Sequence, residues 1–378
     1  MAERGIPGLS VAVSIDGRQR WADGFGLADV ETGAKCNKNT VMRIASISKP
    51  MTSTIAALLV DQGKLDLSKH IQAYIPDFPI KTFNNNPTAI TTRMLLSHTS
   101  GIRNYEKKGE PKPVSDGSAP RTSEFYSNKP FASVTDSLKM FADDELVSEP
   151  GKTFSYTTHG FTVVAAVCEK ASGEKFENLV DDLFRRLGMK NTTLDKNAPI
   201  IRNRAKYYCR NSRGVLENTP EVDNSYKWAG GGILSTVGDL LIFANSILYS
   251  HQFVNGSSSL PQPLISHETC SDFWKGEISI GRNELAGLGW MRVTVPKGGE
   301  VGGAPTARPR GDYWYHSGGA IGASSVLLIQ PQMNTQGDWV FIEDIGVPKG
   351  ICIAILVNVQ SCSVQKLAEE LVEIFRDY

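Results

Sequence analysis

Short runs of β-branched residues at both ends of the chain constrain its fold more than any other feature. Near the start, "LSVAVSIDGRQRWADGFG" (9–26) alternates apolar and polar residues around an Asp-Gly pair, which is the pattern of a β-hairpin. Near the end, "ASSVLLIQP" (323–331) and "GICIAILVN" (350–358) read as strands, and residues 364–378 have helical spacing. Strands at both chain ends predict one antiparallel sheet built from both.

The residues between these strands are mainly helical in pattern. Apolar residues recur at helical spacing in five segments, and this predicts helices that cover the sheet or form an inserted region. The segments are residues 50–63, 134–142, 160–171, 176–187 and 236–249. The predicted fold class is α+β, with an antiparallel sheet flanked by helices and a mainly helical insertion.

A single catalytic domain over residues 1–378 is expected, because no internal repeat and no long linker divides the chain. The sheet region is expected at about residues 1–55 and 285–378, and the helical region at about 56–284. Residues 106–130 are polar and rich in Pro, Gly and Ser, which predicts a mobile surface loop.

The charge balance and the apolar runs exclude several classes of partner. Forty basic and forty acidic residues give a formal net charge of zero, so we expect no nucleic-acid or anionic-membrane partner. No apolar run approaches the roughly 18 residues of a membrane span, and the first residues, "MAERGIPG", lack the apolar core of a signal peptide. Any targeting segment is expected to lie outside this sequence.

Metals, cofactors and disulfides are not predicted either. The six cysteines are scattered without a C-x-x-C pair, and a chain of this size needs no disulfide staples, so we expect reduced thiols. The chain has no H-E-x-x-H motif and no complete glycine-rich phosphate loop.

The segment "RIASISKPMT" (43–52) contains an S-x-x-K motif at the start of a predicted helix. Residues i and i+3 share one helix face, so Ser46 and Lys49 can touch, as a nucleophile and its base must. The helix N-terminus also disfavours protonation of a neighbouring lysine. Pro50 is tolerated only in the first turn, which places the helix start near Ser48. Alternatively, Ser46 or Ser48 merely caps the helix and Lys49 is solvated.

Two further segments change this balance. "GKTFSYTTHG" (151–160) presents Tyr156 before a helical run, and "YWYHSGGAIGASS" (313–325) presents a His-Ser-Gly-Gly sequence where an edge strand is expected to begin. Taken alone, Tyr156 reads as a half-buried aromatic residue and His316 as a loop histidine. The order S-x-x-K, Tyr, His-Ser-Gly, however, resembles the serine β-lactamase and penicillin-binding protein superfamily, whose three motifs meet in one cleft.

One branch of that superfamily is more similar than the rest. "VMRIASISKPMT", "LLSHTSGIRNYEK", "DNSYKWAGGGILSTVGDL" and "HSGGAIGASSVLL" resemble the mitochondrial serine β-lactamase-like protein family over essentially the whole chain. The resemblance implies a penicillin-binding-protein-type hydrolase fold, a mitochondrial location, and peptidase activity linked to lipid metabolism.

The resemblance also implies roles for individual residues. Ser46 would be the nucleophile, Lys49 its proton acceptor, and Tyr156 a proton shuttle to the leaving group. His316 would face the cleft from the third motif, in which Ser317 and Gly318 follow it. The backbone N–H groups of Gly319 and Ser46 would form the oxyanion hole, where a glycine lets the strand approach the acyl carbonyl closely.

One departure from the motifs concerns the substrate. The Y-x-N motif reads Tyr156-Thr157-Thr158, so a hydroxyl stands where relatives have an amide that contacts a substrate carbonyl. The chain also lacks the E-x-x-L-N sequence that supplies a deacylating water in one lactamase class. We therefore expect poor β-lactam hydrolysis.

Several other residues have weaker claims on the site. His98 is expected to be a structural histidine that holds backbone near the nucleophile, and His159 to face either the cleft or the helix surface. The glycines Gly230 to Gly232 are expected to be scaffold beside the site, and Thr236 with Asp239 to form a capping box.

Three hypotheses follow from these motifs. The chain is a serine peptidase or amidase, an esterase that uses the same residues, or a scaffold that keeps the fold for self-assembly. We favour the peptidase, acting on a peptide or small acyl substrate and able to form a homo-oligomer or filament.

Overall fold

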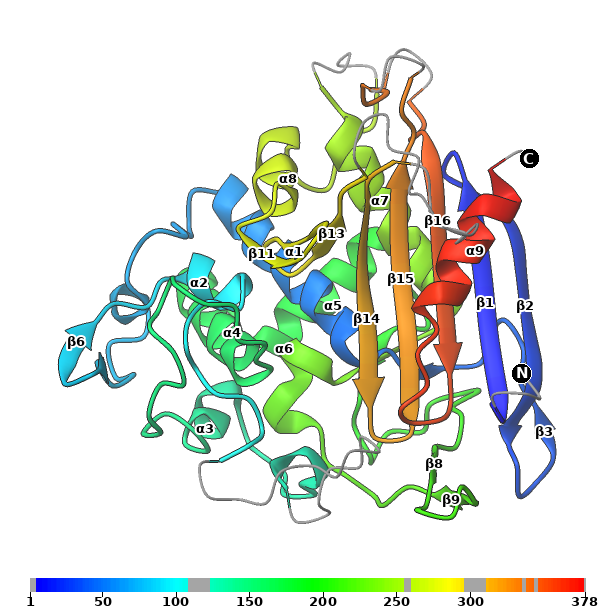
Figure 1. Ribbon diagram of the computed structural model, residues 1–378, viewed down its shortest axis with the longest axis horizontal. Coiled ribbons are helices and arrows are strands. Elements are labelled where there is room, and N and C mark those ends of the chain that lie inside the picture. Colours follow the sequence, from blue (N-terminus) through cyan, green and yellow to red (C-terminus); the bar gives the residue numbers. More distant parts are fainter. Residues whose placement is uncertain are drawn as a thin grey trace.

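The computed structural model, which describes residues 5–107, 123–254, 260–295, 311–334, 338–342 and 346–376, is built around one large sheet (Figure 1). Its strands follow the order β11-β12-β13-β14-β15-β16-β1-β2-β3, and all neighbours are antiparallel. They are β1 (Gly8–Ile15), β2 (Arg18–Asp29), β3 (Ala34–Lys35), β11 (Ile278–Gly281), β12 (Glu284–Ala286), β13 (Met291–Val293), β14 (Tyr313–Ala320), β15 (Ala323–Pro331) and β16 (Gly350–Val357).

The sheet joins the two chain ends, as the sequence predicts. The hairpin β1-β2 turns at Asp16 and Gly17, whose φ values of 51° and 73° are the left-handed pair that a two-residue type I′ turn requires. Strand β1 then pairs with β16, so that Val11 lies opposite Ile355. The predicted bounds of β15 are confirmed, and β16 ends one residue earlier than its predicted run.

The sheet begins before residue 285, near which the sheet region was expected to start, because β11 and the first residue of β12 precede it. Three small sheets also form, β4-β10-β7, β5-β6 and β8-β9, and all of their strands except β4 lie in the region predicted as helical. Their strands are β4 (Met42–Arg43), β5 (Lys81–Phe83), β6 (Asn86–Thr88), β7 (Thr193–Leu194), β8 (Tyr208–Arg210), β9 (Leu216–Asn218) and β10 (Ile233–Ser235).

All five predicted internal helices are present, but the one predicted over 134–142 is shorter than expected, because only Val134–Leu138 is α-helical. The α-helices are α1 (Ser48–Asp61), α2 (Thr92–Leu96), α3 (Val134–Leu138), α4 (His159–Ser172), α5 (Phe176–Leu187), α6 (Trp228–Gly231), α7 (Val237–Gln252), α8 (His267–Trp274) and α9 (Gln365–Phe375). Short 3-10 helices are η2 (Ala45–Ile47), η3 (Ile71–Ala73), η4 (Glu124–Tyr126) and η5 (Ser225–Lys227).

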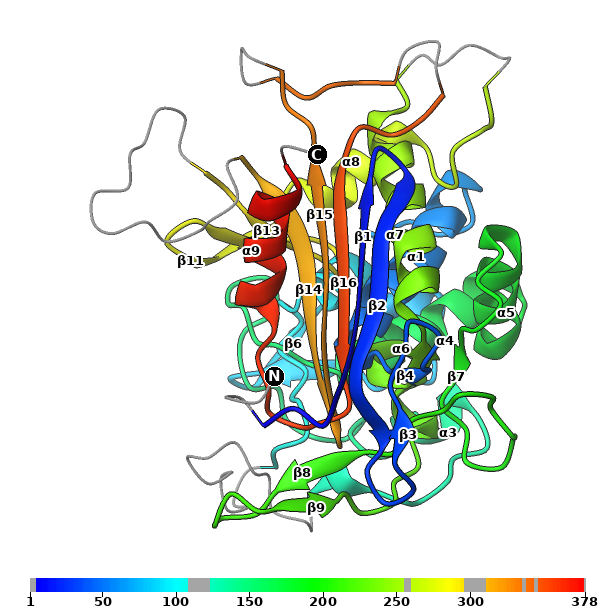
Figure 2. The same ribbon diagram turned by 90° about the vertical axis from the view of Figure 1, so that its right-hand side faces the viewer.

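Helices cover both faces of the central strands, with α9 on one side and α1 and α7 on the other (Figure 2). Successive side chains of a strand point to opposite faces. Along β16, Ile353 and Ile355 therefore pack in the cluster beneath α9, whereas Ala354 and Leu356 pack in the larger cluster on the opposite face. Burial on both faces explains why this strand is a continuous apolar run.

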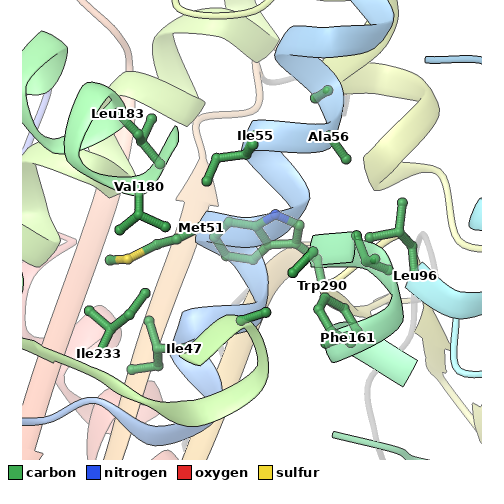
Figure 3. Packing of buried hydrophobic residues seen from close by; sticks show 14 of the residues in the cluster. Ile47, Met51, Ile55, Ala56, Leu96, Phe161, Val180, Leu183, Ile233 and Trp290 are labelled. Carbon is green, nitrogen blue, oxygen red and sulfur yellow. The ribbon is translucent and has the colours of Figure 1, made fainter. Parts of the chain in front are cut away.

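Helix α1 is enclosed by the larger cluster. Figure 3 shows Met51 among Ile47, Ile233 and Val180, while Trp290 and Phe161 approach from another side. Of the fourteen residues of α1, eleven are buried. Close packing on several sides holds the helix firmly, and the S-x-x-K motif lies at its N-terminal end.

Other predictions concern thiols, loops and membranes. All six cysteines are free thiols, as expected. Of the predicted mobile loop 106–130, residues 108–122 lie outside the described residues. Within the described parts of the chain, no helix is long and apolar enough to cross a membrane.

His251, in α7, is enclosed by the rings of Trp274, Trp314 and Trp339, with centroids 4.9, 5.6 and 6.0 Å away. Neither ring nitrogen has a hydrogen-bond partner among the described residues. Burial, followed by the charges of His267 and Arg292, lowers the pKa of His251 to about 3. The folded protein thus holds this imidazole neutral in mild acid.

We expect this histidine to make the fold acid-sensitive. An unfolded histidine has a pKa of about 6.5, so below that pH the unfolded chain binds a proton that the folded chain excludes. The free energy of unfolding should fall by about 1.4 kcal/mol per pH unit between about 6.5 and 3 from this residue alone. His251→Phe keeps an aromatic ring but cannot bind a proton. Urea denaturation at several pH values should therefore show that its free energy of unfolding depends on pH less steeply than that of the natural protein, by that amount. An unchanged slope would contradict this account.

Candidate active site

The chain makes a strained turn immediately before the S-x-x-K serine. Ala45 has φ of 50°, a left-handed conformation that costs a residue with a Cβ about 1 to 2 kcal/mol. Its side chain packs against Ala320 and Ala323 of the sheet, which holds the turn in place. Ser46 follows in η2 and is the only residue between positions 41 and 50 that is not buried. The turn thus presents Ser46 alone to solvent.

The predicted helix start is confirmed, since α1 begins at Ser48 and Pro50 lies in its first turn. Ser48 itself is buried, and its hydroxyl donates to the Ala45 carbonyl at 2.7 Å. This serine therefore closes the turn, and its hydroxyl is turned away from the site.

The Lys49 amine lies beneath Ser46 and is fully buried. Its Nζ is 3.1 Å from Ser46 Oγ, 3.3 Å from Thr158 Oγ1 and 2.6 Å from the Gly230 carbonyl oxygen. A carbonyl only accepts, so Lys49 donates to Gly230, whereas the two hydroxyls can donate to a neutral amine. The geometry accommodates an uncharged Lys49 that accepts the Ser46 proton.

Electrostatics favour that uncharged state. Burial lowers the pKa of Lys49 well below its usual value, and the charge of Lys227 lowers it further. From the sequence, the low pKa of Lys49 was attributed to the helix N-terminus, and the effect of Lys227 was not predicted. Burial also lowers the pKa of Lys227 to about 7, with Arg43 acting in the same direction and Asp195 opposing both. Among the described residues, no carboxylate forms an ion pair with either lysine.

Tyr156 completes the group around Ser46. Burial raises the pKa of its phenol above the usual value, while a hydrogen bond with Ser46 lowers it. Lys49 Nζ lies 4.6 Å from the centroid of the ring, and the His98 ring stacks on it at 4.3 Å. At neutral pH Tyr156 is therefore a neutral phenol that can pass a proton on, and Lys49 is the group suited to act as the base.

His98 has the structural position expected for it. Its ring Nδ1 accepts from the Thr157 backbone N–H at 3.1 Å, and its carbonyl accepts from the Ser155 N–H at 2.7 Å. These two bonds fix the backbone on both sides of Tyr156.

The third motif lies on β14, which is an interior strand of the sheet and not an edge strand. It begins at Tyr313, three residues before His316, and β13 pairs with it only as far as Tyr315. From His316 onward one edge of β14 is therefore free of β13, which is why these residues can face the site.

His316 is neutral in this position. Its Nδ1 is 2.7 Å from the Ser317 carbonyl, so Nδ1 carries the proton and Nε2 has a free lone pair. Burial lowers the pKa of His316 to about 3, the Lys49 charge lowers it too, and the Ser317 bond opposes both. Its ring centroid is 6.2 Å from that of Tyr156.

Gly318 and Gly319 differ in how closely the rest of the protein packs against them. A Cβ on Gly318 would lie 2.1 Å from Ser325 Oγ and 2.6 Å from the Ile44 carbonyl oxygen, whereas a Cβ on Gly319 would meet nothing within 4 Å. Because Gly318 has no side chain, Ser325 Oγ reaches the Ile44 carbonyl at 2.8 Å and ties the sheet to the serine turn. Gly319 is exposed and faces the cavity.

A cavity of about 430 Å³ brings these motifs together. Its lining includes the predicted residues Ser46, Tyr156, Thr158, His316, Ser317 and Gly319, and also Asn104, Tyr105, Lys227, Gly230 and Gly231, which were not predicted as site residues. Within the described residues, no group of three or more His, Cys, Asp or Glu side chains could hold a metal ion.

Two expectations about neighbouring residues were wrong. His159 faces neither the cleft nor solvent, because it is buried against Phe141 and its Nε2 lies 2.9 Å from Glu124. The glycine run is more than scaffold, since the Gly230 carbonyl binds Lys49 directly. Neither His159 nor the glycine run belongs to a sequence motif, so their contacts could not be predicted from the sequence.

Only half of the predicted capping box forms. Thr236 Oγ1 accepts from the Asp239 N–H at 3.2 Å. The Asp239 carboxylate does not turn back to the cap, however, and accepts instead from the Asn191 N–H and the Thr192 hydroxyl.

Known proteins share this architecture. A family model described as Beta-lactamase matches residues 1–372. The "Serine beta-lactamase-like protein LACTB, mitochondrial" of Mus musculus is 37% identical, over 97% of this chain and 76% of that relative. The "D-alanyl-D-alanine-carboxypeptidase/endopeptidase AmpH" of Escherichia coli (strain K12) is 26% identical, over 79% of this chain and 72% of that relative.

A solved structure supports the same assignment of the fold. The octameric penicillin-binding protein homologue from Pyrococcus abyssi has a TM-score of 0.73 and 22% identity, covering 100% of this chain and 75% of that chain. At this level of identity the likeness shows the fold alone, and it confirms the predicted fold class. The chain belongs to the beta-lactamase family and, within it, to the mitochondrial serine beta-lactamase-like proteins.

Proposed function

We propose that this chain is a serine peptidase that works through an acyl-enzyme on Ser46. One observation carries the proposal: the only unburied hydroxyl of the serine turn lies 3.1 Å from a buried amine whose pKa is held low. A nucleophilic serine needs an adjacent general base, and a buried lysine is a base that can be neutral near pH 7.

Acylation would begin when Ser46 Oγ attacks the scissile carbonyl and its proton moves to Lys49 Nζ. The backbone N–H groups of Ser46 and Gly319 would donate to the oxyanion that develops. The proton would then pass by way of the Tyr156 hydroxyl to the leaving amine as the C–N bond breaks. The products of this step are a free amine and an ester on Ser46.

Deacylation would reverse these roles, with water in place of the amine. Water attacks the ester carbonyl and its proton passes by way of Tyr156 to Lys49. Lys49 then returns that proton to Ser46 Oγ as the ester C–O bond breaks and the acid product is released. The chain has no E-x-x-L-N glutamate to activate this water. Slow release is therefore proposed for acyl groups, such as opened β-lactams, that block the approach of water.

Several features support a peptide or small acyl substrate. AmpH is described as a carboxypeptidase/endopeptidase and is similar to 79% of this chain. The mouse relative is described as mitochondrial, which supports the location that the resemblance predicted. A connection with lipid metabolism rests on that resemblance. Homo-oligomer formation is supported by the octameric homologue.

The test is a comparison of kcat/KM for a peptide library, p-nitrophenyl esters and nitrocefin. We expect peptide cleavage that is indifferent to EDTA, weaker ester turnover, and nitrocefin hydrolysis far below the hundreds per second of a dedicated enzyme. Ester turnover without peptide cleavage would support the esterase hypothesis instead. No turnover of any substrate would support a scaffold.

A further inference from the structure

Thr158, in the position where relatives have an amide, has no free donor for a substrate. Its hydroxyl lies 3.3 Å from Lys49 Nζ and also forms a hydrogen bond with Tyr105. Its methyl group faces α6, where a Cβ on Gly230 would lie only 2.6 Å from Thr158 Cγ2. The side chain is thus engaged within the protein on both sides.

An amide from another part of the chain lies beside it. Asn104 lines the same cavity as Ser46, and its Oδ1 accepts from the Thr158 backbone N–H at 3.0 Å. A backbone N–H can only donate, so this bond identifies the oxygen of the Asn104 amide and places Nδ2 on its other arm. No described residue accepts a hydrogen bond from Asn104 Nδ2.

The segment that carries Asn104 is firmly held. Arg103 Nη1 donates to the Asn104 carbonyl at 2.7 Å, and the same guanidinium binds Glu124 at 2.8 and 2.9 Å. Although burial opposes the effect, hydrogen bonds from His159 and Arg103 lower the pKa of Glu124 to about 2, so this carboxylate stays charged. A donor held by its neighbours in this way pays little ordering entropy when it binds a substrate.

We propose that Asn104 supplies the missing amide: its Nδ2 donates to a backbone carbonyl on the acyl side of the substrate. The inference rests on the proposed function and narrows its substrate class to acyl groups that carry an amide carbonyl near the scissile bond, as peptides do. Simple esters lack this carbonyl. Asn104 is then a residue that determines substrate specificity, although it lies outside the Y-x-N motif.

The experiment uses two aryl phosphonates with the same leaving group. One carries an N-acylaminoalkyl chain, and in the other a CH2–CH2 unit replaces the amide. The measured quantity is the ratio of their second-order rate constants for modifying Ser46, followed by mass spectrometry. It is compared between the natural protein, Asn104→Asp and Asn104→Ala. Asn104→Asp keeps an oxygen acceptor for the Thr158 N–H and removes the donor. It also adds a negative charge, whose effect on Ser46 is the same for two probes with one leaving group and cancels in the ratio.

We expect both variants to lower the ratio by about tenfold or more, the effect of losing one hydrogen bond to a buried partner. An equal loss of rate with both phosphonates would leave the ratio unchanged and show that Asn104 only positions Thr158, which overturns the inference. Labelling of Ser46 with the natural ratio in both variants would overturn it too. If neither phosphonate modified Ser46 in the natural protein, the proposed function would fall and the inference with it.

Discussion

Replacing Ser46 by Ala should lower peptide turnover by at least about 10³-fold and leave the fold intact. The nucleophile cannot be replaced by its neighbours, and triad-type serines show losses of this size or larger when removed. Ser46 caps no helix and is partly exposed, so the free energy of unfolding should change by less than about 1 kcal/mol. Steady-state kinetics and urea denaturation of the purified variant measure the two quantities.

Ser48→Ala is the matched control for this prediction. Its hydroxyl bonds to the Ala45 carbonyl within the turn, so its loss should cost about 1 kcal/mol of stability and leave most of the activity. If Ser48→Ala abolished turnover while Ser46→Ala did not, the nucleophile would have been assigned to the wrong serine.

Replacing Lys49 by Met should lower kcat by about 10² to 10⁴-fold, because this is the range that general bases contribute. Methionine has a similar length and suits a fully buried site, and thermal denaturation should therefore show a folded protein. In this variant the Ser46 and Tyr156 hydroxyls remain, but no neutral amine is present to accept the Ser46 proton.

Lys49→Arg separates the basicity of Lys49 from its charge. A guanidinium remains protonated at any working pH, so it places a fixed positive charge at position 49 and cannot accept the Ser46 proton. We expect it to be as inactive as Lys49→Met. Substantial activity in Lys49→Arg would mean that position 49 contributes charge and that another group is the base.

Patterns within single segments allowed much of the fold to be predicted. The runs that form β15 and β16 are long, β-branched and buried on both faces, so their sequences hold a strong local signal. Strands β11 to β13 have only three or four residues each, too few for a clear alternating pattern. They form by pairing with one another and with β14, which the local sequence does not show. The sheet region was therefore predicted to begin too late.

The motif residues Ser46, Tyr156 and His316, which line one cavity, could be picked out because each lies in a segment with a recognisable motif. Lys227 and Asn104 also line the cavity but could not be picked out, since neither belongs to one of these motifs. A charged residue directly before the apolar run "WAGGGIL" was the one available hint for Lys227. The tight contact at Gly318 depends on three-dimensional packing against Ile44 and was not predicted.

The most direct test of the account is to identify the residue that a fluorophosphonate modifies. Intact-mass measurement followed by peptide mapping should find a single adduct, located on Ser46, that forms faster as the pH rises from acid toward neutral because Lys49 must be uncharged to accept the proton. An adduct on Ser48 or another residue, or no adduct at neutral pH, would contradict the proposal that Ser46 is an activated nucleophile.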